Sequence, residues 1–110
     1  KKKIKFIKSK RVKLINVKLN KHDEFDLKKI MSILYQNNIR FLLVEGGNHF
    51  TNKMLDQNLF NEFYLIKSYN KLRQSGKLNI KKIVYKLPKK FKIKNNINQY
   101  FDKNRITRFT

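Results

Sequence analysis

One segment of this 110-residue chain combines residue types and spacing suited to binding an anionic ligand: F-L-L-V-E-G-G-N-H-F-T-N-K at positions 41–53. The four apolar residues Phe41–Val44 predict a short strand buried on both faces, because no alternation leaves a polar side. Glu45 and two glycines follow, and Asn48 is predicted to cap a helix. Such a strand, glycine turn and helix start place free backbone N–H groups where open α/β sheets bind phosphates.

Other kinds of active site are excluded by composition. The chain has no cysteine, which excludes disulfides, thiol catalysis and cysteine-ligated metal, and which favours a reducing compartment such as the cytoplasm. The two histidines, His22 and His49, are too far apart for metal-ligand spacing, so no metal site is predicted. No apolar run has membrane-spanning length, so no membrane partner is expected.

The net charge of +21 has two interpretations. A strongly basic chain is typical of nucleic-acid binding. The lysines are spread from end to end, however, and the chain combines many Lys, Asn and Ile residues with no alanine. That joint bias is what an AT-rich coding sequence produces at tolerant surface positions. We therefore take coding bias as the main cause and polyanion binding as the alternative.

The elements that must position the 41–53 segment begin upstream. Residues 1–8 are expected to form an edge strand or a connection, and residues 11–19 a strand. Asp26 is a predicted N-cap, and Asn37 with Asn38 is predicted to end the helix that follows. This helix carries one apolar stripe at i, i+3, i+4 and i+7, formed by Leu27, Ile30, Met31 and Leu34. Strand, helix and strand together match a right-handed βαβ unit.

Downstream, a second helix is predicted with its core face formed by Phe50, Met54 and Leu55. A turn at Leu59–Glu62 leads into an interior strand at Phe63–Ile66, and a loop is expected at 68–78. Residues 81–87 predict a strand or a short helix that Pro88 ends. Residues 100–110 predict a terminal hairpin. The predicted fold class is α/β, with a βαβαβ order followed by antiparallel edge strands.

With these residues in place, the chain resembles the C-terminal reductase domain of the bifunctional riboflavin-biosynthesis deaminase-reductases. The resemblance is carried by L-L-V-E-G-G-N at Leu42–Asn48 and by D-Q-N-L-F-N-E-F-Y-L at Asp56–Leu65. The upstream D-L-K-K-I-M-S-I-L-Y lies at the expected spacing. The resemblance covers roughly residues 11 to 67. It implies a dihydrofolate-reductase-like sheet with flanking helices.

The resemblance also implies an activity, the NADPH-dependent reduction of the ribosyl group of 5-amino-6-(5-phosphoribosylamino)uracil to a ribityl group. The enzyme would be a homodimer acting on this pyrimidine ribosyl phosphate. This chain, 1–110, would be the C-terminal part of a single reductase domain. The first half of that domain, and any deaminase domain, would lie outside the chain, and the fragment would be inactive alone.

The resemblance assigns site residues as well. It implies substrate contact by Glu45, and no catalytic side chain, since in hydride transfer the cofactor supplies the chemistry. The residues implied to contact NADPH are Gly47, Asn48, His49, Phe50, Thr51, Asn52 and Lys53. Each of these assignments has an alternative that stays open. Gly46-Gly47 would be only a tight strand-to-helix turn, and Glu45 would form a surface salt bridge with a lysine.

The alternative function is a small basic RNA-binding or ribosome-associated protein. Its sequence signal is the dispersed lysines interleaved with aromatic residues. No RNP motif, zinc-finger spacing or helix-turn-helix pattern accompanies them, so a nucleic-acid partner is not the favoured expectation.

Overall fold

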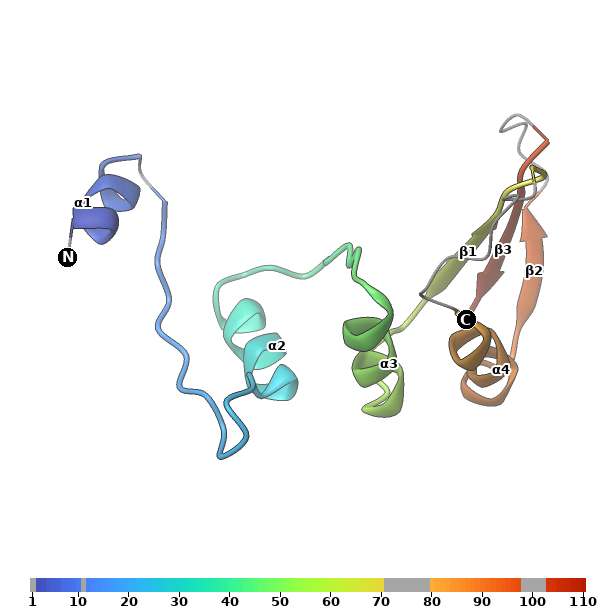
Figure 1. Ribbon diagram of the computed structural model, residues 1–110, viewed down its shortest axis with the longest axis horizontal. Helices are drawn as coiled ribbons and strands as arrows, with labels where there is room; N and C mark the ends of the chain where they lie inside the picture. The colour runs from blue at the N-terminus through green and yellow to red at the C-terminus, as the bar shows by residue number, and fades with distance from the viewer. Residues whose placement is uncertain (1, 11, 71–79, 98–102) are drawn as a thin grey trace. The chain divides into compact units, whose positions relative to one another are not determined.

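The computed structural model describes residues 2–10, 12–70, 80–97 and 103–110 (Figure 1). In chain order its elements are α1 (Lys2–Ser9), α2 (Leu27–Gln36), α3 (Asn48–Asp56), β1 (Phe63–Lys67), α4 (Lys81–Lys90), β2 (Lys94–Ile97) and β3 (Arg105–Phe109). They belong to two compact units, Lys1–Leu42 and Leu43–Thr110. The protein is therefore a mixed α/β chain, and each unit is described by itself.

The start of the first unit differs from the sequence prediction. Residues 2–9 form helix α1 instead of an edge strand. Residues 12–18 form no strand, and an isolated antiparallel bridge joins Leu19 to Phe25. The physical reason is that a helix satisfies its backbone hydrogen bonds internally, whereas a strand requires a neighbouring strand. In the described part of this unit no such neighbour is formed.

Helix α2 confirms the local signals at both of its ends. The Asp26 carboxylate accepts a hydrogen bond from the Lys29 backbone N–H at 3.1 Å, which is the predicted N-cap. At the other end Asn38 has a φ of 63°, in the left-handed region. The Ile39 N–H donates to the Leu34 carbonyl at 3.1 Å, which completes a Schellman motif. Asparagine thus ends the helix as predicted.

The second unit contains a three-stranded antiparallel sheet with strand order β1-β3-β2. The predicted strand at 63–66 is confirmed as β1, but it is an edge strand and not an interior one. The predicted hairpin within 100–110 is wrong, because Ile106 pairs with Ile97 on one side and with Ile66 on the other. The residues expected to form the first arm of that hairpin, 100–102, lie outside the described residues.

Helix α4 resolves the ambiguity at 81–87 in favour of a helix. Pro88 does not end it: the Phe91 N–H donates to the Leu87 carbonyl at 3.0 Å, and the helix continues to Lys90. Proline lacks a hydrogen-bond donor, but near a helix end this removes a single bond. The core lies among α3, α4 and β3, and its buried members are Leu55, Ile83, Leu87 and Phe109.

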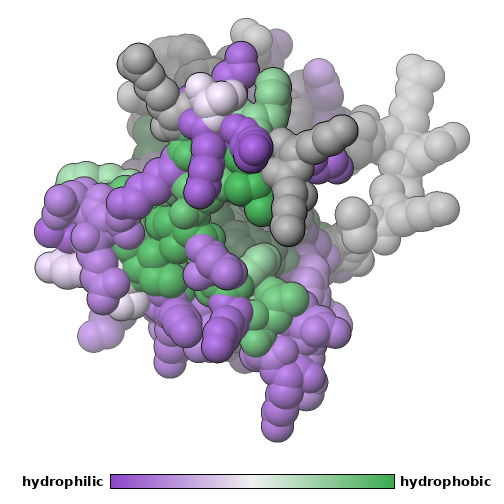
Figure 2. All heavy atoms as spheres, turned by 90° about the vertical axis from the view of Figure 1, so that its left-hand side faces the viewer, coloured by the Kyte–Doolittle hydropathy of each residue, from purple (hydrophilic) through white to green (hydrophobic). Residues whose placement is uncertain are grey.

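The apolar segment Phe41–Val44 is the main correction to the predicted fold. It forms no strand, and Phe41 and Leu43 are 96% and 84% exposed. Figure 2 shows that hydrophobic side chains reach the surface beside hydrophilic ones. A buried parallel strand needs partners on both sides, and none of the strands among the described residues pairs with this segment. The predicted parallel βαβαβ arrangement is therefore not formed in this part of the chain, whereas the antiparallel C-terminal strands are.

Candidate functional site

The candidate site is the junction between the glycine pair and helix α3. The helix begins at Asn48, so the N-cap is Gly47 and not Asn48 as predicted. Gly47 has no side chain to bond the first-turn N–H groups, and the first bond of the helix is the one from the Thr51 N–H to the Gly47 carbonyl, at 3.0 Å. The N–H groups of the first turn have no carbonyl partner within the helix. They supply the partial positive charge that favours an anion at a helix start.

The two glycines have different roles. A Cβ atom on Gly46 would lie 2.7 Å from the Cδ1 atom of Phe50, so this position is filled by a packed ring. A Cβ atom on Gly47 would meet no atom of the described residues within 4 Å. The φ of Gly47 is −68°, which any residue adopts, so the backbone alone does not require glycine here. The open space at Gly47 lets a phosphate approach the backbone closely, and the site therefore fits a nucleotide cofactor.

The predicted site residues on α3 lie in different environments. Thr51 is buried, and its hydroxyl donates to the Gly46 carbonyl at 3.3 Å, which ties the helix to the glycine turn. His49 is exposed and Lys53 is half-buried. Phe50 is 38% exposed, so its predicted place in the core is wrong. Met54 and Leu55 are buried as predicted.

Glu45 is exposed and lies directly before the glycine pair. The predicted buried strand that would have held it is absent from the described residues, so its backbone is in irregular structure. A carboxylate in this place accepts hydrogen bonds and has no donor of its own when ionised. It is therefore suited to contact hydroxyl or amide groups of a ligand that lies beside the glycine turn.

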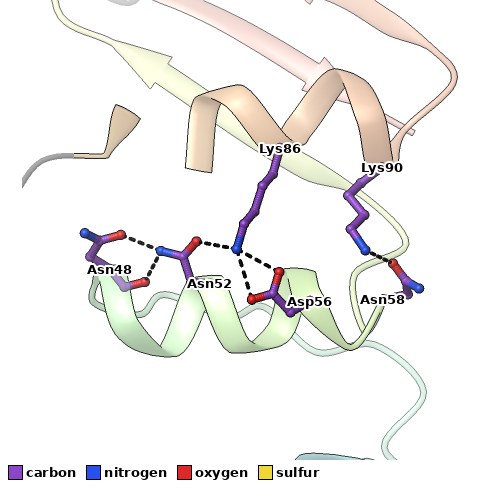
Figure 3. Close-up of polar contacts among 6 residues, drawn as sticks. All are labelled: Asn48, Asn52, Asp56, Asn58, Lys86 and Lys90. Carbon is purple, nitrogen blue, oxygen red and sulfur yellow. Dashed lines mark hydrogen bonds and ion pairs between the residues drawn. The ribbon is translucent and has the colours of Figure 1, made fainter. Parts of the chain in front are cut away.

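A polar network joins the start of α3 to α4 (Figure 3). The Asn52 amide Nδ2 donates to the Asn48 carbonyl at 2.9 Å and to the Asn48 Oδ1 at 2.8 Å. The Lys86 ammonium donates to the Asn52 Oδ1 at 3.0 Å and to the Asp56 carboxylate at 2.7 and 2.9 Å. Sequence reasoning missed Lys86, because it is one of many lysines and its contact with Asn52 depends on the packing of α4 against α3.

A second network fixes the predicted turn at Leu59–Glu62 to the sheet. The Glu62 carboxylate accepts hydrogen bonds from the Tyr64 hydroxyl at 2.8 Å and from the Arg108 Nη2 at 2.6 Å. The hydrogen bond from Tyr64 is the main cause that lowers the pKa of Glu62, and Arg108 lowers it further. The same contacts raise the pKa of Tyr64 and that of Arg108. Glu62 and Tyr64 are exposed and Arg108 is half-buried, and we assign the network a structural role in holding the turn.

Two further features of the described residues bear on the type of site. No helix in the ranges that the structure describes is long and apolar enough to cross a membrane. In the same part of the chain, no three acidic or histidine side chains gather as they would around a metal ion. The glycine turn and the start of α3 remain the strongest candidate, and this combination is typical of phosphate-binding α/β domains.

Comparison with known proteins identifies the family. The family model described as the RibD C-terminal domain matches residues 1–68, which is more than half of the chain and includes every predicted site residue. The chain therefore belongs to this family, the reductase-type domain of riboflavin biosynthesis. No curated protein matches the chain. No solved structure matches it either. The family match confirms the resemblance stated from the sequence, and it does not favour the RNA-binding alternative.

Proposed function

We propose that the chain is part of an NADPH-dependent reductase that converts the ribosyl group of 5-amino-6-(5-phosphoribosylamino)uracil to a ribityl group. The observation that carries this proposal is the family match over residues 1–68, which spans the whole candidate site. In the proposal the chain is the C-terminal part of a dihydrofolate-reductase-like domain, within a longer cytoplasmic protein that acts as a homodimer.

The residues of the α3 start would hold the cofactor. When bound, NADPH supplies the hydride that reduces the ribosyl carbon. The first-turn N–H groups of α3 bind a phosphate of the cofactor, and the open space at Gly47 allows its approach. Buried Thr51 holds the glycine turn in place through its hydrogen bond to Gly46. Lys53, in the second turn of α3, adds positive charge near the phosphate.

Glu45 would bind the other reactant. Its exposed carboxylate precedes the glycine turn by one residue, so substrate and cofactor phosphate would lie on either side of that turn. As an ionised acceptor, Glu45 bonds hydroxyl or N–H groups of the pyrimidine ribosyl phosphate. A carboxylate that orients the substrate contributes to position and not to the hydride step itself.

The proposal is tested on the full-length protein encoded by the reading frame that contains this chain. NADPH oxidation is followed by absorbance with 5-amino-6-(5-phosphoribosylamino)uracil as substrate. Glu45→Gln is expected to raise the KM for the substrate by about tenfold, the cost of a hydrogen bond to a charged group, and to leave NADPH affinity unchanged. Glu62→Gln is the matched control, because Glu62 bonds Tyr64 and Arg108 and is not proposed to touch a ligand. Absence of substrate-dependent NADPH oxidation in the wild-type protein would overturn the proposal.

A further inference from the structure

Thr51 binds the carbonyl groups of both glycines in the turn. Its backbone N–H donates to the Gly47 carbonyl at 3.0 Å, and its hydroxyl donates to the Gly46 carbonyl at 3.3 Å. The side chain is buried, and it lies on the side of the turn because side chains in a helix point toward the N-terminus. Both carbonyl oxygens of the glycine pair are therefore turned toward the helix.

The bond to Gly46 also sets the direction of an N–H group. In a trans peptide the carbonyl of one residue and the N–H of the next residue point to opposite sides. Since the Gly46 carbonyl faces Thr51, the Gly47 N–H faces away from it. Gly47 is exposed, and its N–H has no acceptor among the residues that the structure describes. The turn therefore offers a donor of its own beside the first-turn N–H groups of α3.

The opposite orientation of this peptide would hinder the binding of an anion. A flip would turn the Gly46 carbonyl oxygen outward, and its partial negative charge would repel a phosphate that approaches Gly47. Glycines on both sides of the peptide have no Cβ atom to oppose such a flip. In the described part of the chain, the Thr51 hydroxyl is the group that binds the Gly46 carbonyl and so favours one orientation.

We propose that Thr51 is a positioning residue for the anionic cofactor, because its hydroxyl holds the Gly46–Gly47 peptide with the Gly47 N–H directed at a phosphate of NADPH. This inference rests on the proposed function, which places that phosphate at the start of α3. It gives the phosphate a donor in the turn itself, in addition to the N–H groups of the helix. Thr51 acts by orienting this donor and not by contact with the ligand.

A second buried threonine supplies a matched control. The Thr107 hydroxyl, in β3, donates to the Asn96 Oδ1 at 3.2 Å, and neither residue belongs to the candidate site. Thr107→Val and Thr51→Val each remove one hydroxyl hydrogen bond and keep a β-branched side chain of the same shape. Thr51→Ser keeps the hydroxyl and removes only the methyl group.

The experiment measures the Kd for NADPH by fluorescence titration of the full-length protein, together with KM, kcat and thermal unfolding. Thr51→Val is expected to raise the Kd and the KM for NADPH by about fivefold, the factor that corresponds to one neutral hydrogen bond. The kcat at saturating NADPH should stay within about twofold, because the reacting atoms are not touched. Thr51→Ser and Thr107→Val should each leave the Kd within about twofold, although Thr107→Val should lower the unfolding temperature as Thr51→Val does.

A measurement on the wild-type protein keeps the inference falsifiable if Thr51→Val folds poorly. Amide hydrogen exchange at Gly47, measured residue by residue, should slow by at least about tenfold when NADPH binds, because a hydrogen-bonded N–H is protected from exchange. Unchanged exchange at Gly47, an unchanged Kd in Thr51→Val, or an equal loss of affinity in Thr51→Ser or Thr107→Val would overturn the inference alone. A wild-type protein that binds no NADPH would overturn the proposed function and this inference with it.

Discussion

Alanine substitutions at Gly46 and Gly47 test separately the packing and the binding roles of the glycine pair. At Gly46 a new Cβ atom would lie 2.7 Å from Phe50, where ordinary contacts begin at 3.4 Å. Phe50 is 38% exposed, so its side chain is not confined by the core. Overpacking costs about 1–3 kcal/mol, and we expect about 1 kcal/mol here because the ring has this freedom.

At Gly47 the opposite pattern is expected. Its φ of −68° suits alanine, and a Cβ atom there would lie more than 4 Å from every other atom in the part of the chain that the structure describes. Alanine lowers the conformational entropy of the unfolded chain, which stabilises the folded protein by about 0.4–1 kcal/mol. Against this, alanine is a poorer N-cap than glycine by a similar amount. The net change in the free energy of unfolding is therefore expected to be within about 0.5 kcal/mol. The methyl group would occupy the space proposed for a phosphate, so the Kd for NADPH should rise at least about tenfold.

The assay is urea unfolding for stability and fluorescence titration for NADPH, with both variants made in the full-length protein. Gly46→Ala should lose stability and keep most of its affinity, whereas Gly47→Ala should keep stability and lose affinity. Equal affinity losses in the two variants would refute the assignment of separate roles. Unchanged NADPH affinity in Gly47→Ala would contradict the proposed place of the phosphate.

The remaining predictions concern the core, the sheet and the first unit. Leu87→Ala, at a position that is 0% exposed, should lower the free energy of unfolding by about 2–5 kcal/mol in urea unfolding. The pKa of Glu62 in the folded protein lies below its usual value. The ionised Glu62 carboxylate therefore stabilises the fold at a pH above the usual value, and this stabilisation is lost as the pH falls through the folded-state pKa. Tyr64→Phe and Arg108→Gln should each raise the pKa of Glu62 measured by NMR titration of its carboxyl carbon, because each removes a hydrogen bond that lowers it. Asn38→Ala should destabilise by about 1 kcal/mol, because its φ of 63° is strained for alanine, whereas glycine there should not.

The sequence by itself determined the elements whose signals are local. The Asp26 cap and the left-handed Asn38 are properties of a few adjacent residues, and both ends of α2 follow from them. Residues 63–66 were also predicted correctly as a strand, although not as an edge strand, and Met54 and Leu55 of α3 are buried as predicted. The sequence also indicated the glycine pair as a candidate site, and the family match confirms the resemblance from which its proposed roles are taken.

Tertiary structure decided everything that depends on a distant partner. Phe41–Val44 has the composition of a buried strand, yet it stays exposed because a strand exists only where another strand accepts its hydrogen bonds. Strand β3 pairs with both β1 and β2, and residues close in sequence gave no sign of that register. The link from Lys86 to Asn52 spans 34 residues. Local propensity acts within a few residues, whereas strand pairing and helix packing join segments whose proximity exists only in the folded chain.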